Sequence, residues 1–212
     1  MKTFRFVPHM DGKDHINLYS KGKTVAGRVL THMSPFSVEL GGMRFATLEG
    51  YWYYRRVIEI LSRKPNWGGP RNDAEWVINL QNAGSGFEAK KVGRNYLSMY
   101  GEGEPKTEMT EDFRNLIREA NRVRIEQHKF LKAMLLSTGD LELAHYYYYG
   151  AESNARVIHD PVYDWIPEYL MKLREEYRST IAHENVVALV KWANDKVPTR
   201  PQWNGCLVFD LE

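Results

Sequence analysis

The chain has 212 residues, of which 43% are hydrophobic and 26% charged, a composition typical of a folded globular protein. Its formal net charge is only +2, so charge does not indicate a nucleic-acid-binding protein. Cys206 is the only cysteine, which excludes an intramolecular disulfide and a cysteine-rich zinc site. The single cysteine suits the reducing cytoplasm, where we expect the protein. Charged residues interrupt the apolar ones near the N-terminus and throughout the chain, so we expect no membrane partner.

The N-terminal part of the sequence predicts short strands followed by a helix. The first 45 residues alternate glycines with short apolar runs at 16–19 and 36–40, a pattern typical of strands and turns. From Thr47 onward apolar residues recur at helical spacing instead. Thr47 is a suitable N-cap, and Pro65 ends the helix.

The middle of the chain predicts further helices. Residues 73–83 and 86–99 form two of them, separated by a glycine-containing turn. The strongest helical pattern begins at Thr110, with acidic residues in its first turn, and we expect one continuous helix to Leu136. Gly139 is a fitting stop signal.

The C-terminal part predicts helices at 162–178 and 184–194 and a short final strand at 206–209. Together these elements indicate an α+β, mostly helical fold with short N-terminal strands and a helical C-terminal extension. We place the main domain at 1–160 and the extension at 161–212, packed on the same domain.

Four segments occur in a distinctive order. A Gly-Arg pair precedes an apolar loop in 16–36, and 45–56 has an acidic residue followed by aromatic ones. The pattern Ala-Lys-x-x-Gly-Arg lies in 87–95, and Leu-Leu-x-Thr-Gly-Asp lies in 129–150. In this order and spacing the segments resemble the NADAR/YbiA-like family. The resemblance implies a single YbiA-like multihelical domain.

The chain departs from the family pattern in two places. The family's usual Leu-Ser-Asn-Phe reads Leu-Thr-His-Met at 30–33, so a substrate contact made by that Asn is lost or altered. Residues 145–150 read His-Tyr-Tyr-Tyr-Tyr-Gly, where the YbiA branch has an Asp and a Trp-Gly pair. This resembles a second branch that is common in phage-borne relatives.

The resemblance implies an N-glycosidase that removes ADP-ribose from a modified base, with guanine in DNA as the implied base. Such an enzyme would bind ADP-ribosylated DNA and reverse a DNA-modifying ADP-ribosyltransferase toxin, as a phage counter-defence. We expect no metal or other cofactor, since the sequence has no His-Glu-x-x-His motif and no phosphate loop. Two alternatives stay open: hydrolysis of a phosphoribosylamino-pyrimidine of riboflavin synthesis, and a non-catalytic module that binds ADP-ribose or blocks the toxin.

Cleavage of an N-glycosidic bond needs a stabilised ribosyl cation, a proton for the departing nitrogen and an activated water or nucleophile. Glu49 would lie in the first turn of its helix, where the dipole favours the ionised carboxylate. It is either a favourable first-turn acid or, as the family match implies, the general base or charge stabiliser. Lys90 matches a family lysine and is the second catalytic candidate, through a Schiff base with a ring-opened sugar.

Several charged residues are candidates for binding the substrate. Lys90 and Arg94 lie four apart and share a helix face, where they would either be solvated or hold a diphosphate. Arg28 follows a glycine in the family's Gly-Arg pair, which implies phosphate binding. Asp140 would either hold a ribose hydroxyl or cap a turn.

Aromatic residues are candidates for stacking on the base or the adenine ring. Trp52 and Tyr53 follow the acidic residue of the second segment, with core packing as the alternative. In a strand, two of the four tyrosines at 146–149 would point inward and two outward. The sequence does not decide which pair is which, and we assign Tyr147 and Tyr149 to the site.

Overall fold

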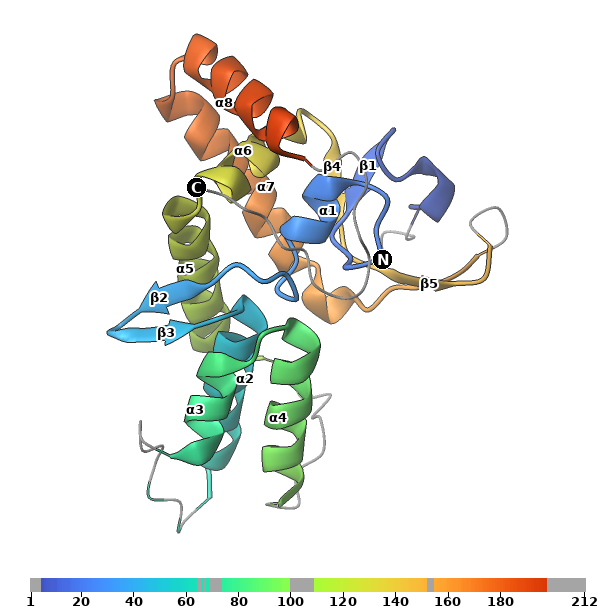
Figure 1. Ribbon diagram of the computed structural model, residues 1–212. Helices are drawn as coiled ribbons and strands as arrows, with labels where there is room; N and C mark the ends of the chain where they lie inside the picture. Colours follow the sequence, from blue (N-terminus) through green and yellow to red (C-terminus); the bar gives the residue numbers. More distant parts are fainter. Residues whose placement is uncertain are drawn as a thin grey trace. The chain divides into compact units, whose positions relative to one another are not determined.

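The computed structural model describes residues 5–64, 66, 68, 74–99, 109–151 and 155–197 (Figure 1). In chain order its elements are η1 (Pro8–Met10), β1 (His15–Asn17), α1 (Val25–Val29), β2 (Val38–Leu40), β3 (Met43–Phe45), α2 (Leu48–Leu61), α3 (Glu75–Asn82), α4 (Gly86–Met99), α5 (Glu111–Gln127), α6 (Lys129–Ser137), β4 (Glu142–Ala144), β5 (Tyr147–Tyr149), β6 (Arg156–Ile158), η2 (Pro161–Tyr163), α7 (Trp165–Thr180) and α8 (His183–Lys196). Helices predominate and the strands pair in twos, which confirms the predicted α+β, mostly helical class.

The described chain divides into two compact units. The first contains η1, β1, α1, α6, β4, β5, β6, η2, α7 and α8, and the second contains β2, β3 and α2 to α5. The chain leaves the first unit after Thr31 and returns to it at His128. The predicted boundary at residue 160 between a domain and an extension stays a prediction.

In the first unit, α6 is the most apolar element and packs against α1, α7 and α8. Strand β1 pairs with β4 in parallel, and α7 packs on β4. Lys129 and Lys132 of α6 place their ammonium groups 4.5 and 4.2 Å from the ring centres of Trp192 on α8 and Tyr177 on α7. Helices α7 and α8 confirm the two predicted C-terminal helices. The two lysine–ring contacts help to hold both helices against α6.

The first 45 residues were predicted as short strands and turns; β1 and β2 confirm strands near 16–19 and 36–40, whereas 25–29 forms the short helix α1 instead. The side chain of Thr24 accepts a hydrogen bond from the Gly27 amide and so caps a helical turn. Gly27 also approaches β1 closely, because a Cβ at this position would lie 2.3 Å from the Asn17 carbonyl oxygen. A capped turn against a strand edge, rather than a further strand, therefore satisfies the backbone here.

In the second unit, α2 is the central helix and contacts α3, α4 and α5. It begins where predicted, since Thr47 accepts a hydrogen bond from the Gly50 amide at 3.1 Å. Gly50 lets α3 approach, because a Cβ there would lie 2.6 Å from the Leu80 carbonyl oxygen. The predicted helices at 73–83 and 86–99 are confirmed as α3 and α4.

The single helix predicted from Thr110 to Leu136 is two helices, α5 and α6. His128 breaks them apart in an extended conformation, with φ −119° and ψ 98°. The apolar residues on either side of it belong to different cores, since α5 packs on α2 and α6 packs on α1 and α8. One extended residue redirects the chain, and helical periodicity alone does not reveal it. Gly139, with φ 58°, follows the end of α6 as predicted.

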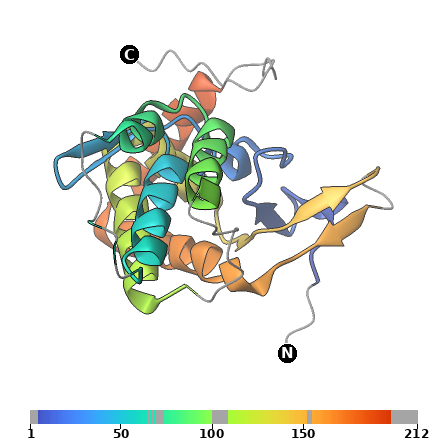
Figure 2. The same ribbon diagram turned by 90° about the horizontal axis from the view of Figure 1, so that it is seen from below.

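The tyrosine segment forms a two-stranded antiparallel ribbon, in which β5 pairs with β6 (Figure 2). The predicted strand at 206–209 lies outside the described residues. Within the described ranges, no helix combines the length and the apolar character needed to cross a membrane.

Candidate active site

The start of α2 carries the predicted catalytic carboxylate. Glu49 lies in the first turn of α2 and is half-buried. Its amide donates a hydrogen bond of 3.0 Å to the carbonyl oxygen of His32, on the loop before β2. The Thr47 cap and this second bond both satisfy first-turn amides, so the direction in which α2 begins is firmly set.

The loop at 32–34 is attached to three helices of the second unit. Besides the bond to α2, the carbonyl oxygen of Met33 accepts a hydrogen bond of 3.3 Å from the Gly86 amide, where α4 begins. From α5, Nη1 of Arg124 lies 3.4 Å from the hydroxyl oxygen of Ser34. A Cβ on Gly86 would lie 2.4 Å from Met33 Cα, so glycine is required at this approach. The loop is thus a fixed part of the site.

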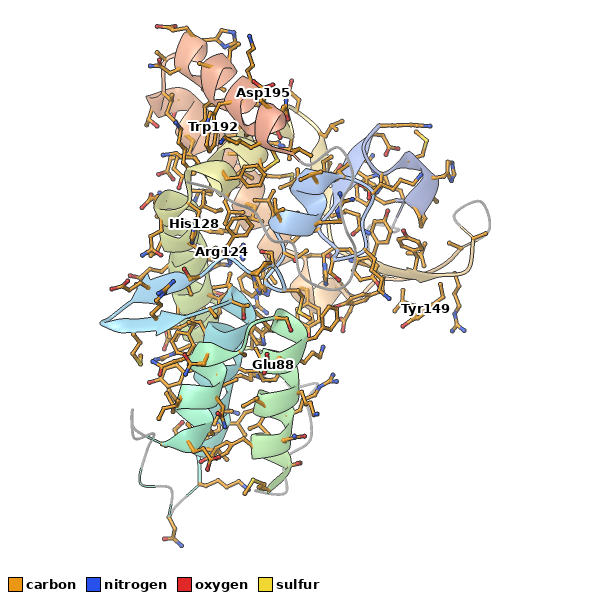
Figure 3. The ribbon with its side chains drawn as sticks, in the orientation of Figure 1. Glu88, Arg124, His128, Tyr149, Trp192 and Asp195 are labelled. Atoms are coloured by element: carbon orange, nitrogen blue, oxygen red, sulfur yellow. The ribbon has the colours of Figure 1, made fainter. Side chains whose placement is uncertain are left out.

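Two buried polar side chains of α5 face this loop. Arg124 is fully buried, and burial lowers the pKa of its guanidinium to about 9, so it remains cationic at neutral pH (Figure 3). Asn121, one turn earlier and also fully buried, places its Nδ2 atom 3.1 Å from the ring Nε2 of His32. These residues were missing from the sequence prediction, and so was His32 as a positive candidate.

A signal for the α5 pair was present in the sequence. Phe113, Ile117, Asn121 and Arg124 follow one another at spacings of three or four, and all four are buried. Polar residues on the apolar stripe of a helix need buried partners, and such groups are often functional. A prediction that considers only the apolar residues of α5 misses Asn121 and Arg124 on its buried face.

Lys90 and Arg94 lie on one flank of α4. The residues of α4 that are buried are Gly86, Ala89, Gly93 and Leu97. At roughly 100° per residue, Lys90 and Arg94 flank this stripe on one side and Tyr96 on the other. Tyr96 stacks on Trp76 of α3, with ring centres 4.4 Å apart, so the two cations lie on the flank away from α3. Lys90 is half-buried and Arg94 exposed.

Glu49 and Lys90 lie at the same level of the α2–α4 pair. The two helices run in the same direction, with Met33 against the start of α4 and Tyr53 against Gly93 further along (Figure 1). Glu49 lies four residues before Tyr53, and Lys90 three residues before Gly93. Both are therefore one turn N-terminal to the same contact, and Arg94 lies one turn beyond.

Trp52 and Tyr53 are buried in the packing around α2. Trp52 is 9% exposed and meets the ring of Phe113 edge-on at 4.9 Å, and the ring of His32 lies 5.4 Å from it. Tyr53 is 4% exposed and packs on Gly93, where a Cβ would lie 2.2 Å from the tyrosine ring. Core packing thus accounts for Tyr53 fully, and stacking of either residue on a base stays a prediction.

In the first unit, Arg28 holds its own loop. Its Nη1 atom donates hydrogen bonds to the carbonyl oxygens of Gly22, at 2.9 Å, and Lys23, at 2.6 Å. Burial lowers the pKa of Arg28, and the nearby Asp11 carboxylate opposes that shift. Phosphate binding by Arg28 stays a prediction, and these two bonds are a structural role that the sequence did not reveal.

Asp140 lies just beyond Gly139 and is ion-paired with α7. Its carboxylate oxygen accepts a hydrogen bond of 2.7 Å from Arg178, although the side chain is 96% exposed. This hydrogen bond, aided by the positive charge of Arg178, lowers the pKa of Asp140. The sequence-based choice was between a ribose ligand and a turn cap, and the structure adds this ion pair.

The tyrosine ribbon has one buried and one outward side. Tyr146 is fully buried, with its hydroxyl oxygen 2.7 Å from Nε2 of His15. Tyr147 and Tyr149 are 36% and 65% exposed, and the hydroxyl of Tyr147 lies 3.2 Å from Nε2 of His145. Tyr147 and Tyr149 are therefore the outward pair, which the sequence could not decide.

The predicted site residues fall into two groups, one in each unit. The second unit contains Glu49, Trp52, Tyr53, Lys90 and Arg94, and the first contains Arg28, Asp140, Tyr147 and Tyr149. Within the second unit, the carboxylate and the two cations lie on neighbouring parts of α2 and α4. Convergence of the two groups on one substrate stays a prediction. Within the described ranges, no three His, Cys, Asp or Glu side chains are grouped as metal ligands would be.

Comparison with family models and with curated proteins gives no match. Among solved structures, the NMR structure of the E. coli protein YbiA is similar, with 18% sequence identity and a TM-score of 0.49. The match covers 80% of this chain and 91% of that one. A likeness this distant assigns no activity and no residue role.

Proposed function

We propose that the protein is an N-glycosidase that removes ADP-ribose from a modified base, guanine in DNA, and that Glu49 is its catalytic carboxylate. The observation that supports this most is the arrangement in the second unit. A half-buried carboxylate in the first turn of α2 lies level with Lys90 on α4, and Arg94 follows one turn later. A carboxylate and two cations on neighbouring turns of two packed helices would suit a ribose that carries a diphosphate.

In this reaction Glu49 acts on the sugar. The bond between the anomeric carbon and the base nitrogen breaks, and its electron pair leaves with the base. Glu49 stabilises the ribosyl cation and takes a proton from the attacking water, whose oxygen bonds to the anomeric carbon. That proton then passes to the base. The start of α2 favours the ionised carboxylate that these steps need.

The remaining candidates would bind the substrate. Lys90 and Arg94 would hold the diphosphate, because a lysine supplies a point charge and an arginine can bond two oxygens at once. Tyr147 and Tyr149 present outward rings on which a base can stack. We further propose reversal of a DNA-modifying ADP-ribosyltransferase toxin as the biological setting, with phage counter-defence as one instance.

The test is incubation of guanine-ADP-ribosylated DNA with the wild type and with Glu49→Gln. The matched control is Glu168→Gln, because Glu168 is also a first-turn glutamate, at the start of α7. We expect the wild type and the control to release ADP-ribose and Glu49→Gln to be slower by about 10²- to 10⁴-fold, the usual contribution of a general base. Full activity in Glu49→Gln would remove Glu49 from the mechanism.

Two other outcomes would indicate other functions. Release of ribose 5-phosphate from a phosphoribosylamino-pyrimidine, with intact ADP-ribosylated DNA, would make the riboflavin intermediate the substrate. Calorimetry that shows tight ADP-ribose binding, with no product from either substrate, would indicate a binding module. Either result would contradict the proposed activity.

A further inference from the structure

The tautomer of His32 follows from the way α5 holds it. Nδ2 of Asn121 lies 3.1 Å from Nε2 of His32 and 3.1 Å from the carbonyl oxygen of Ile117. A backbone carbonyl can only accept, so the amide group that faces it must be the NH₂ and not the oxygen. That same NH₂ donates to His32, so Nε2 accepts. The neutral ring of His32 therefore carries its proton on Nδ1.

His32 lies beside the backbone of Glu49, the residue that carries the candidate catalytic carboxylate. Its carbonyl oxygen accepts the hydrogen bond from the Glu49 amide at 3.0 Å. Its ring lies 5.4 Å from that of Trp52, which is three residues after Glu49 and so on the same side of α2. His32 itself is only half-buried, whereas Asn121 behind it is fully buried. The buried side of the ring is thus held by α5, next to the start of α2.

The arrangement holds His32 as a neutral donor. A protonated ring would direct Nε2–H against the NH₂ of Asn121, and two donors would face each other. A neutral imidazole N–H near a helix N-terminus is an established means of stabilising developing negative charge in an enzyme. In N-glycoside cleavage that charge develops on the departing base, which receives the bonding electron pair.

We propose that His32 is a further catalytic residue, a neutral imidazole whose Nδ1–H donates a hydrogen bond to the departing base, and that Asn121 is its positioning residue. The proposal rests on the glycosidase function and adds the group that acts on the base, whereas Glu49 acts on the sugar. No proton transfers from His32. The electron pair of the broken bond stays on the base until the proton from water reaches it.

The first experiment compares His32→Ala with His32→Asn on guanine-ADP-ribosylated DNA. Asparagine retains an amide donor near the position of Nδ1, whereas alanine removes it. We expect His32→Ala to lower kcat by about 100-fold, as for the loss of one preorganised donor, with a much smaller change in KM. His32→Asn should regain most of that loss. The control is His183→Ala, because His183 is exposed at the start of α8.

Asn121→Asp tests the positioning role at nearly constant size. A carboxylate would accept from Nε2–H and so favour the protonated ring or the other tautomer. We expect kcat to fall with little change in KM, while Asn121→Asp still unfolds cooperatively. A wild-type kcat in either His32→Ala or Asn121→Asp, with an active wild type, would overturn this proposal alone and leave the glycosidase function standing.

The second experiment needs no substrate. The ¹⁵N chemical shifts of the His32 ring distinguish the two neutral tautomers, and we expect the Nδ1–H form in the wild type and its loss in Asn121→Asp. An Nε2–H tautomer in the wild type would overturn the proposal whatever the activity. A wild type with the expected tautomer but no glycosidase activity would overturn the proposed function, and with it the catalytic role of His32.

Discussion

Arg174 in the first unit and Arg124 in the second are both buried helix residues, and they differ in their surroundings. Arg174 of α7 donates to the Thr138 hydroxyl at 2.9 Å, to the Leu141 carbonyl at 2.8 Å and to its neighbour Glu175 at 3.0 Å. Arg124 of α5 is fully buried, and desolvation dominates its pKa, which is lowered to about 9. Arg174 therefore fastens α7 to the turn after α6, whereas burial of Arg124 costs free energy.

This difference indicates where function lies. Removing a charge from water costs free energy, and proteins often retain such a charge where its surroundings use it. Arg124 lies one turn from Asn121 and faces the loop that supports Glu49. We therefore expect the second unit to retain residues that lower its stability but support activity.

The largest effect on stability should distinguish the two arginines. Arg174→Met removes three hydrogen bonds and leaves a buried hydroxyl and carbonyl without them, so we expect the free energy of unfolding to fall by about 3 kcal/mol. Arg124→Met also removes a cation whose burial costs desolvation free energy, so we expect a smaller fall in the free energy of unfolding at pH 7. Urea denaturation of both variants measures this. An equal loss in both would show that Arg124 is as structural as Arg174.

The next effect concerns one close-packed glycine in each unit. Gly27→Ala would place a Cβ 2.3 Å from the Asn17 carbonyl oxygen, and Gly93→Ala would place one 2.2 Å from the Tyr53 ring. We expect each to cost about 1–3 kcal/mol from overpacking. Gly27→Ala should cost more, since backbone yields less than a side chain. Thermal unfolding of both variants measures which loss is larger. A larger loss for Gly93→Ala would mean that α2 and α4 cannot move apart to accommodate the new methyl group.

The sequence predicted most of the longer helices and few of the contacts that give the site its chemistry. Thr47 and the first-turn position of Glu49 could be predicted because capping is local. The break at His128 could not, since it depends on which core each helix joins. Nor could the Asn121–His32 bond, which joins residues 89 positions apart. Local rules place a residue on a helix, whereas convergence depends on tertiary packing.

A smaller effect is the pH dependence that Arg124 contributes. Burial lowers its pKa to about 9 in the folded protein, well below the ordinary value that it has in the unfolded chain, so above about pH 9 the unfolded chain binds more protons. Stability attributable to Arg124 should therefore rise as pH increases through about 9, and show no such slope near pH 7. The measurement is the difference in unfolding free energy between wild type and Arg124→Met from pH 7 to 11. If this difference did not change with pH, burial would not lower the pKa of Arg124.

The smallest effect should come from Asp140, the exposed member of the predicted set. Its pKa is lowered by the hydrogen bond from Arg178, so any stability from the pair is present above the unfolded value, near 3.8, and is lost as pH falls through the folded value. Solvent screens so exposed a pair, so Asp140→Asn should barely change thermal unfolding at pH 7 and not at all once the carboxyl is protonated. Activity is then the informative readout. Loss of ADP-ribose release in this stably folded variant would make Asp140 a substrate ligand from the first unit, whereas wild-type activity would restrict the chemistry to the second.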